Sequence, residues 1–302
     1  MNNEVKKVLF IINKFAGTGF QPALEGRMID TCARYDAECT IEFTQSRGHA
    51  TELAERASSQ GFDIVVAVGG DGTINEVAKG AIRNKMPMGI IPRGSGNGLA
   101  RHLGIPLKVA DGVESLFNSR VLNMDTFSIN GKLSLNVSGI GFDGRIANLF
   151  GEKTRRGLAG YVSLTLKEYF TFKPFAAEIE IEGKILTKEP FVIAIANSSQ
   201  YGNNARIAPQ ASVCDQLLHI TLLKKIPPYR ADFIYAFFTG QLTNSHFCEM
   251  IETPSLRIKT PHDVPYHVDG EPCGVRHEFN IEVMPAALPV LVPNTPSQHK
   301  RL

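Results

Sequence analysis

The sequence lacks the features that would mark several common classes of protein. Its 302 residues include only five cysteines, odd in number and without a Cys-x-x-Cys pair, which favours reduced thiols in a cytoplasmic protein over a disulfide framework. The net charge is +2, so there is no strong case for a nucleic acid partner. The first apolar run, residues 8–13, is too short for a signal peptide or a membrane span, so we expect any contact with lipid to be peripheral.

Two familiar nucleotide-binding motifs are also missing. No Gly-x4-Gly-Lys-Ser/Thr segment is present, which excludes a P-loop enzyme. No Gly-x-Gly-x-x-Gly segment opens the first predicted helix, and no acidic residue ends the second predicted strand. These two absences argue against a NAD(P) dehydrogenase.

The most informative segment that is present, residues 63–76, reads Asp-Ile-Val-Val-Ala-Val-Gly-Gly-Asp-Gly-Thr-Ile-Asn-Glu. Residues 64–68 form a short β-branched apolar run, typical of a strand covered on both faces. The glycines that let the following turn approach a ligand closely are Gly69, Gly70 and Gly72. Residues 73–76 have the form of a capping box, which predicts that a helix begins at Thr73 and directs its N–H groups and dipole at an anion.

Asp71 lies in the middle of this turn and would repel a bare phosphate. Its presence therefore argues for a metal ion or a hydroxyl beside the phosphate, and a nucleoside triphosphate with a divalent cation satisfies all of these conditions. The alternative is a plain strand-to-helix turn, in which Asp71 only holds the backbone by hydrogen bonds.

A second glycine turn favours the nucleotide interpretation. Residues 88–92 form another short apolar strand, which runs into Arg-Gly-Ser-Gly-Asn-Gly at residues 93–98. Three glycines in five residues, with Ser95 and Asn97 between them, are typical of an anion-binding turn. Because both turns follow strands of a predicted parallel sheet, we expect them to lie side by side at the edge where α/β sheets bind ligands.

Together the two turns resemble the catalytic domain of diacylglycerol kinases and, more closely, the soluble bacterial lipid kinases related to it and to sphingosine kinases. The Gly-Gly-Asp-Gly turn is also found in NAD kinases and phosphofructokinases, and the second turn separates this chain from them. The resemblance continues along nearly the whole chain, at Asn13 and Gly17, Thr44 with Gly48-His49-Ala50, Gly141-Phe-Asp143, Asn197-Ser198, Ala208-Pro209 and Val268-Asp-Gly-Glu271.

The predicted fold class is α/β plus β. Alternating strands and helices indicate a three-layer α/β domain over residues 1–126, and the resemblance implies a nucleotide-binding domain of the NAD kinase and diacylglycerol kinase type. After residue 126 the pattern changes to short strands and turns, beginning with a type I′ hairpin signal at Asn130-Gly131. We therefore expect a mostly antiparallel, β-sandwich-like domain over residues 127–284, with helices at 157–170 and 231–242, and the resemblance implies that it binds the lipid substrate. The resemblance implies that residues 285–302 return to the first domain.

The resemblance also implies where ATP and Mg²⁺ bind. The residues expected at the nucleotide are Asn13, Gly17, Thr44, Gly69, Gly70, Asp71, Gly72, Thr73, Asn75, Glu76, Gly94, Ser95, Gly96 and Asn97. Asp71 is the candidate for contact with the catalytic magnesium or the transferring phosphate.

A second candidate for chemistry is the Asp-Gly-Glu segment at residues 269–271. A hydroxyl is a poor nucleophile, so a nearby carboxylate that accepts its proton is a sensible device. The resemblance makes Glu271 the candidate base, with Asp269 orienting the loop or bridging to the metal. A surface β-turn is the alternative, because Asp-Gly is common in such turns.

A structural magnesium site is implied at residues 208–219. The Asp215 carboxylate and the carbonyl groups of Ser212 and Leu217 would supply the oxygen ligands that magnesium prefers. The family usually has Asp-Gly-x-Leu-Asp here, whereas this chain has Gln216 in place of the glycine and His219 in place of the second aspartate.

The predicted function is therefore an ATP-dependent kinase that phosphorylates a hydroxyl of a lipid such as diacylglycerol or a sphingoid base. We expect a cytoplasmic protein in peripheral contact with a membrane surface, and a homodimer is left open. A basic cluster at residues 153–156, before the apolar helical stretch at 161–170, could dock on anionic headgroups, and the alternative is a helix that packs on a sheet with its charges solvated. The alternatives are a NAD kinase-like enzyme and a non-catalytic protein that binds nucleotide or lipid on the same scaffold.

Overall fold

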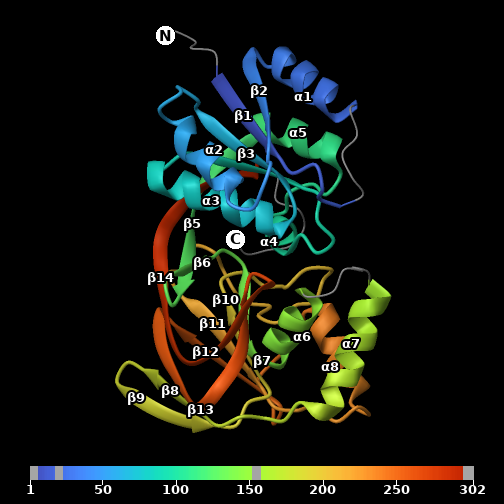
Figure 1. Ribbon diagram of the computed structural model, residues 1–302, viewed down its shortest axis with the longest axis vertical. Helices are drawn as coiled ribbons and strands as arrows, with labels where there is room; N and C mark the ends of the chain where they lie inside the picture. The colour runs from blue at the N-terminus through green and yellow to red at the C-terminus, as the bar shows by residue number, and fades with distance from the viewer. Residues whose placement is uncertain (1–5, 18–22, 152–157, 295–302) are drawn as a thin grey trace. The chain divides into compact units, whose positions relative to one another are not determined.

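The computed structural model describes residues 6–17, 23–151 and 158–294 of the chain (Figure 1). It divides into two compact units, Met1–Asp125 with Pro285–Leu302, and Thr126–Met284. Strands β5 (Ser119–Ile129) and β14 (Glu271–Pro293) run through the boundary and contribute to both units. The basic cluster at residues 153–156 lies outside the described residues.

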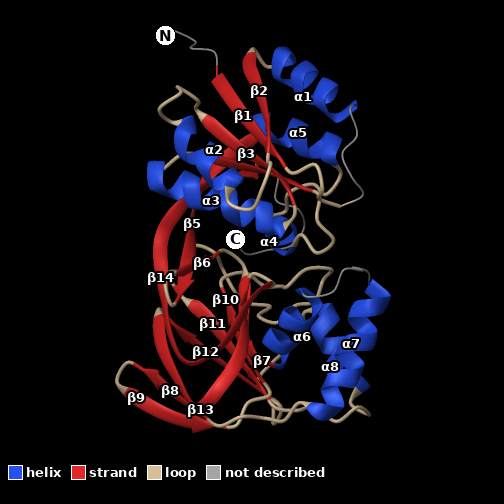
Figure 2. Ribbon diagram, in the orientation of Figure 1, coloured by secondary structure: helices blue, strands red, loops and turns tan. Residues whose placement is uncertain are grey.

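The first unit is built on a parallel sheet with the strand order β2-β1-β3-β4. Its strands are drawn in red in Figure 2. The end of β14 joins this sheet beside β4, where Val290 pairs with Met88. Its strands and helices follow one another as β1 (Lys6–Ile12), α1 (Ala23–Arg34), β2 (Ala37–Phe43), α2 (His49–Ala57), β3 (Ile64–Gly69), α3 (Asp71–Asn84), β4 (Met88–Pro92), α4 (Gly98–His102) and α5 (Val109–Phe117).

Helices cover both faces of this sheet. Helix α1 packs with α5, and α2 packs with α3. Alternate residues of β1, among them Val8, Phe10 and Ile12, are buried in one core cluster with Met28 of α1 and Val113 of α5. The period of two along a strand directs the intervening residues to the opposite face. This is the three-layer α/β fold that the alternating pattern predicted.

The start of α3 differs from the sequence-based prediction. The helix begins at Asp71, its N-cap is Gly70 in an extended conformation, and no side chain caps it. The prediction of a capping box at residues 73–76, and of a helix start at Thr73, is therefore wrong. The hydroxyl of Thr73 instead accepts a hydrogen bond from the Asn13 side-chain amide at 3.2 Å. Two residues of the predicted glycine turn thus belong to the first turn of the helix, and Asp71 complements its dipole there.

The second unit is mostly antiparallel, with the strand order β12-β11-β10-β7-β13-β14. The β8–β9 hairpin extends β13, and β6 pairs with β5. The bounds are β6 (Lys132–Ser134), β7 (Val137–Gly141), α6 (Phe142–Gly151), α7 (Leu158–Thr171), β8 (Ala177–Ile181), β9 (Lys184–Lys188), β10 (Val192–Ala196), β11 (Leu218–Leu223), α8 (Ala231–Thr239), β12 (Cys248–Thr253) and β13 (Ser255–Val268).

Strand β10 shows how this unit makes two cores. Ile193 and Ile195 lie in a cluster formed by strands, whereas Val192, Ala194 and Ala196 lie in a cluster with α6, α7 and α8. One face of the sheet therefore packs against other strands and the other packs against helices. The β-sandwich-like domain that the sequence predicted is present, and α7 and α8 confirm the helices predicted at 157–170 and 231–242.

Two local details test the sequence-based prediction further. Asn130 and Gly131 have φ values of 50° and 75°, as a type I′ turn requires, and the hairpin prediction is confirmed. Helix α6 and the break between β6 and β7 were not predicted. Among the described residues, no helix is long and apolar enough to span a membrane.

Candidate functional site

In the first unit the two glycine turns touch each other. The amide of Arg93 donates a hydrogen bond to the carbonyl of Gly69 at 2.7 Å. A Cβ atom added at Gly94 would lie 2.9 Å from the Cα of Gly70 and 3.7 Å from the amide nitrogen of Asp71. Only glycine fits at this closest approach, because real Cβ atoms do not come within 3.0 Å of a backbone atom.

Asn97 closes the second turn through its side chain and joins it to the first turn through its backbone amide. Its side-chain oxygen accepts from the amide of Gly94 at 2.8 Å, and its side-chain nitrogen donates to the Gly94 carbonyl at 2.8 Å. Its backbone amide donates to the Asp71 carboxylate at 3.2 Å. Asn97 has a φ of 51°, a left-handed conformation that asparagine tolerates well. The Asp71 carboxylate is thereby held at the junction of the two turns, at the first turn of α3.

A third segment reaches the same edge of the sheet. Asn13 follows β1, and its amide donates to the carbonyl of Val68 at 3.0 Å. The amide of Thr44, which follows β2, donates to the carbonyl of Ile12 at 2.9 Å. Gly17 has a φ of 65°, and a Cβ there would lie 2.3 Å from the carbonyl oxygen of Arg93. Four strands of the parallel sheet therefore end at one edge, each followed by residues that the resemblance places at the nucleotide.

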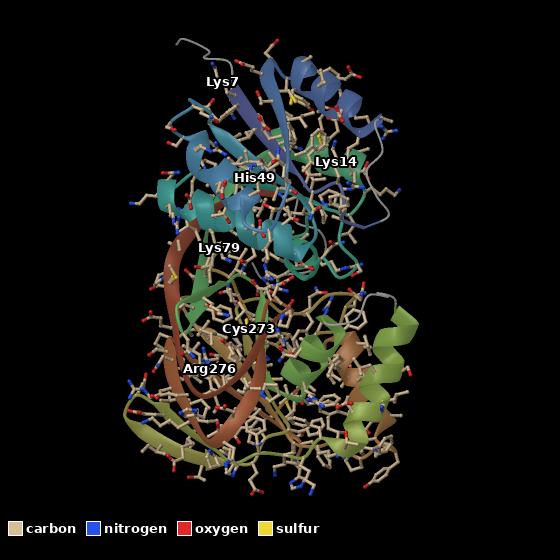
Figure 3. The ribbon with its side chains drawn as sticks, in the orientation of Figure 1. Lys7, Lys14, His49, Lys79, Cys273 and Arg276 are labelled. Atoms are coloured by element: carbon tan, nitrogen blue, oxygen red, sulfur yellow. The ribbon has the colours of Figure 1, made fainter. Side chains whose placement is uncertain are left out.

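The remaining predicted nucleotide residues lie within or beside these turns. Asn75 is buried in α3, and Glu76 is half-buried one residue further on. Ser95 is exposed, and the carbonyl of Gly96 accepts from Arg101 at 3.1 Å. The Lys14 ammonium lies 3.7 Å above the ring of Phe43, next to the end of β2 (Figure 3). The edge thus carries fixed cations as well as the dipole of α3, an arrangement that suits a polyphosphate.

In the second unit the Asp-Gly-Glu segment forms a two-residue hairpin turn. Asp269 and Gly270 have φ values of 49° and 82°, and Val268 pairs with Glu271 across the turn. Both central residues are therefore in the left-handed region, as in a type I′ turn. Glu271 is the first residue of β14 and is exposed.

The carboxylate of Asp269 is turned onto the segment between β6 and β7. It accepts hydrogen bonds from the Ser134 hydroxyl at 2.6 Å, from the amide of Leu135 at 2.9 Å and from the amide of Asn136 at 3.0 Å. These three donors satisfy the carboxylate within the protein, which supports a role in orienting the loop rather than direct contact with a substrate.

A buried histidine beside the hairpin was not among the predicted site residues. His267 is 3% exposed, and its Nδ1 atom accepts a hydrogen bond from the amide of Gly270 at 3.0 Å. Its Nε2 atom lies 3.3 Å from the carboxylate of Asp143, which also accepts from the Tyr201 hydroxyl at 2.9 Å. The Gly141-Phe-Asp143 motif was the signal in the sequence that could have drawn attention to Asp143.

The predicted magnesium ligands do not form a clear metal site. The Asp215 carboxylate accepts from the amide of Leu217 at 3.0 Å and lies 3.3 Å from Nε2 of His219. Nδ1 of His219 lies 3.6 Å from a carboxylate oxygen of Glu252. Within the described residues, no group of three or more His, Cys, Asp or Glu side chains is placed to hold a metal ion.

This arrangement does not fit the oxygen-only ligand set that magnesium prefers. Nε2 of His219 lies beside the Asp215 carboxylate, which is the only carboxylate among the predicted ligands. The Ser212 hydroxyl accepts a hydrogen bond from the amide of Cys214 at 3.3 Å. Gln216 occupies the family's glycine position with a φ of 62°. We derive no chemistry through a metal at this place.

Comparison with known proteins agrees with the two units. Residues 7–129 match the family model described as the diacylglycerol kinase catalytic domain, and residues 136–292 match the YegS C-terminal NAD kinase beta sandwich-like domain. The chain is 31% identical over 262 residues to "Probable lipid kinase YegS-like" of Yersinia enterocolitica, covering 84% of this chain and 86% of that protein. It is 30% identical over 268 residues to "Probable lipid kinase YegS" of Escherichia fergusonii, with the same coverage of each chain.

A solved structure described as a diacylglycerol kinase from Bacillus anthracis str. Sterne shares the fold, with a TM-score of 0.75 and 22% identity over 96% of this chain and 97% of that one. The matched domains cover both units that the structure separates. The chain therefore belongs to the diacylglycerol kinase catalytic-domain family, in the form that carries a YegS-type C-terminal domain.

Proposed function

We propose that this protein is an ATP-dependent lipid kinase, which transfers the γ-phosphoryl group of ATP to a hydroxyl of a lipid such as diacylglycerol or a sphingoid base. The observation that carries the proposal is the contact between the two glycine turns at Gly70 and Gly94. Family membership and the printed names of the YegS-like relatives support a lipid as the acceptor.

In this proposal the first unit holds the triphosphate. Backbone amides at the start of α3 and at Ser95 and Gly96 would face the phosphates, and the glycines leave room for close approach. Asn97 holds the Asp71 carboxylate in place, where this carboxylate would hold the magnesium ion that accompanies ATP. That ion, when bound, neutralises charge on the phosphate oxygens.

The second unit supplies the base. The lipid hydroxyl oxygen forms a bond to the γ-phosphorus, the bond from that phosphorus to the bridging oxygen breaks, and ADP leaves. Glu271 accepts the hydroxyl proton, and its exposure leaves it accessible to an acceptor. Asp269 keeps the turn in place through Ser134, Leu135 and Asn136. The acceptor would be reached by peripheral contact with a membrane surface.

The proposal is tested by incubating the protein with radiolabelled ATP and magnesium over a panel of detergent-dispersed lipids. The panel contains diacylglycerol, a sphingoid base, phosphatidylglycerol and a monoacyl lipid, and NAD is included as a separate acceptor. Label in one or more lipids is the expected result. Label in NAD alone would establish the NAD kinase alternative, and no transfer to any acceptor would favour the non-catalytic alternative.

The role of Glu271 is tested by Glu271→Gln, with Glu282→Gln as the matched control. Glu282 is an exposed glutamate on the same strand. We expect Glu271→Gln to lower kcat by about two to four orders of magnitude, the usual contribution of a general base. ATP affinity should stay unchanged, and Glu282→Gln should behave as the unmodified protein. An unchanged kcat for Glu271→Gln would remove this residue from the mechanism.

A further inference from the structure

His267 is joined to the Asp-Gly-Glu hairpin by a hydrogen bond whose direction is fixed. A backbone N–H can only donate, so Nδ1 of His267 must be the acceptor of the 3.0 Å bond from Gly270. An imidazole that accepts at Nδ1 carries its single ring hydrogen on Nε2. The ring is thus in one defined tautomer, with its acceptor directed at the residue that precedes Glu271.

Asp143 selects that tautomer from the other side of the ring. The Nε2–H group lies 3.3 Å from the Oδ2 atom of Asp143. Because a carboxylate oxygen can only accept a hydrogen bond, it favours the tautomer with the ring hydrogen on Nε2. The same oxygen accepts from Tyr201, and the Oδ1 atom accepts from the amide of Gly144 at 2.8 Å. Both carboxylate oxygens are therefore held, and the carboxylate cannot rotate without breaking a bond.

The space for this carboxylate is also built into the fold. A Cβ atom added at Gly139 would lie 1.7 Å from the Oδ2 atom of Asp143. The absence of a side chain at Gly139 on β7 thus leaves room for the Asp143 carboxylate where it contacts His267 and Tyr201. His267 itself is 3% exposed, so water does not compete for its ring nitrogens.

The hairpin is held at three separate points. The Asp269 carboxylate binds the segment between β6 and β7, the Asp269 amide donates to the Ser138 hydroxyl at 3.2 Å, and the Gly270 amide donates to His267. We propose that His267 is a positioning residue for Glu271, oriented by Asp143 and Tyr201, and that it acts through the Gly270 amide. This inference rests on the role proposed above for Glu271 as the base. A loss of about 1 Å in placement can cost on the order of a hundredfold in rate, so the bond to Gly270 would affect turnover more than stability.

Two substitutions separate the two sides of the ring. In His267→Asn the side-chain oxygen lies where Nδ1 was and can still accept from Gly270, but the donor to Asp143 is lost. In His267→Gln the side chain reaches towards Asp143, but the acceptor for Gly270 is lost. His277→Gln is the matched control, because His277 makes the same kind of contact, 2.9 Å to Asp263, in an exposed place on β14.

We measure kcat, the KM for ATP and the melting temperature of each variant, using the lipid of the panel that is phosphorylated fastest. We expect His267→Gln to lower kcat by about 10-fold to 100-fold with the KM for ATP within about twofold. His267→Asn should keep a kcat at least about tenfold above that of His267→Gln, although both lose a hydrogen bond and melt at lower temperatures. Equal kcat values for the two variants would overturn the inference.

A double substitution distinguishes this inference from the proposed function. If His267 acts through Glu271, then His267→Gln combined with Glu271→Gln should be no slower than Glu271→Gln alone. Additive losses would overturn the inference and leave the base assignment intact. A kcat of Glu271→Gln equal to that of the unmodified protein would overturn both.

A measurement without turnover tests the hydrogen bond itself. The exchange rate of the Gly270 amide hydrogen, followed by NMR, should rise in His267→Gln and stay near its original value in His267→Asn. If both His267 variants fail to fold, Tyr201→Phe provides the milder test, because it removes one of the bonds that hold Asp143. It should lower kcat more than His277→Gln does, and equality with that control would overturn the inference.

Discussion

The clearest structural test of the hairpin concerns Asp269. The sequence predicts it as a catalytic residue, whereas in the structure its carboxylate accepts hydrogen bonds from the segment between β6 and β7. Asp269→Ala removes the acceptor of three hydrogen bonds. It leaves the buried hydroxyl of Ser134 and the amides of Leu135 and Asn136 without that partner. Each such group costs about 1–3 kcal/mol when left unsatisfied. Because Asp269 is half-buried and water can replace part of the loss, we take about 3 kcal/mol for the three together.

The backbone adds a second term. Asp269 has a φ of 49°, and alanine in the left-handed region costs about 1 kcal/mol. The total is therefore about 4 kcal/mol for Asp269→Ala. Asp269→Asn keeps the left-handed preference and one acceptor oxygen, but its NH₂ group faces one backbone amide and makes no bond there. We expect Asp269→Asn to cost about 1–2 kcal/mol.

These free energies convert into melting temperatures that calorimetry resolves. At about 2–4 °C per kcal/mol, Asp269→Ala should melt about 8–16 °C lower and Asp269→Asn about 2–8 °C lower. Calorimetry and circular dichroism are the appropriate methods, because the chain has no tryptophan whose fluorescence could report unfolding. If the two units melt separately, only the transition of the unit at residues 126–284 should move.

The outcome that would refute this reasoning is a melting temperature of Asp269→Ala equal to that of the unmodified protein. The carboxylate would then not hold the segment between β6 and β7, and direct participation in catalysis would become the better account of Asp269. Equal destabilisation by alanine and asparagine would also contradict it, because the two differ in the hydrogen bonds that they can keep.

Two further predictions concern the first unit and the metal. Gly94→Val should lower ATP affinity at least about tenfold in titration calorimetry, because its Cβ lies 2.9 Å from the Cα of Gly70. Gly26→Val is the control, since nothing lies within 4 Å of its Cβ, and equal affinities would contradict the loop assignment. After chelation and without nucleotide, added magnesium should leave the melting temperature unchanged, because His219 meets the Asp215 carboxylate. A rise with magnesium, as binding to the folded state produces, would show that the structural site persists.

Elements defined by local chemistry could be predicted from the sequence. The Asn130-Gly131 hairpin needed only two residues that accept positive φ, and both have it. The strand-turn-helix units of the first domain followed from short apolar runs and glycines. The start of α3 was misplaced by two residues because a capping box is a pattern of side chains, whereas the structure uses Gly70 as the N-cap without any side-chain bond.

Elements defined by distant partners could not be predicted. Residues 132–137 have the pattern of one continuous strand, but the amides of Leu135 and Asn136 are taken by Asp269, more than 130 positions away in the chain. The strand therefore divides into β6 and β7. In the same way, nothing near His267 in the sequence indicates that its partner is Asp143.

The two units therefore differ in how their candidate residues are specified. In the first unit each candidate residue follows a strand of one parallel sheet, so the order of the strands alone brings Asn13, Thr73 and Asn97 to the same edge. In the second unit the hairpin also depends on bonds to distant segments, from the Asp269 carboxylate to residues 134–136 and from His267 to Asp143. Substitutions of candidate residues in the first unit should consequently change nucleotide binding directly. In the proposed mechanism, substitutions in the second unit can change the placement of Glu271 even at residues that do not contact the acceptor hydroxyl. A stability measurement must therefore accompany each kinetic measurement there.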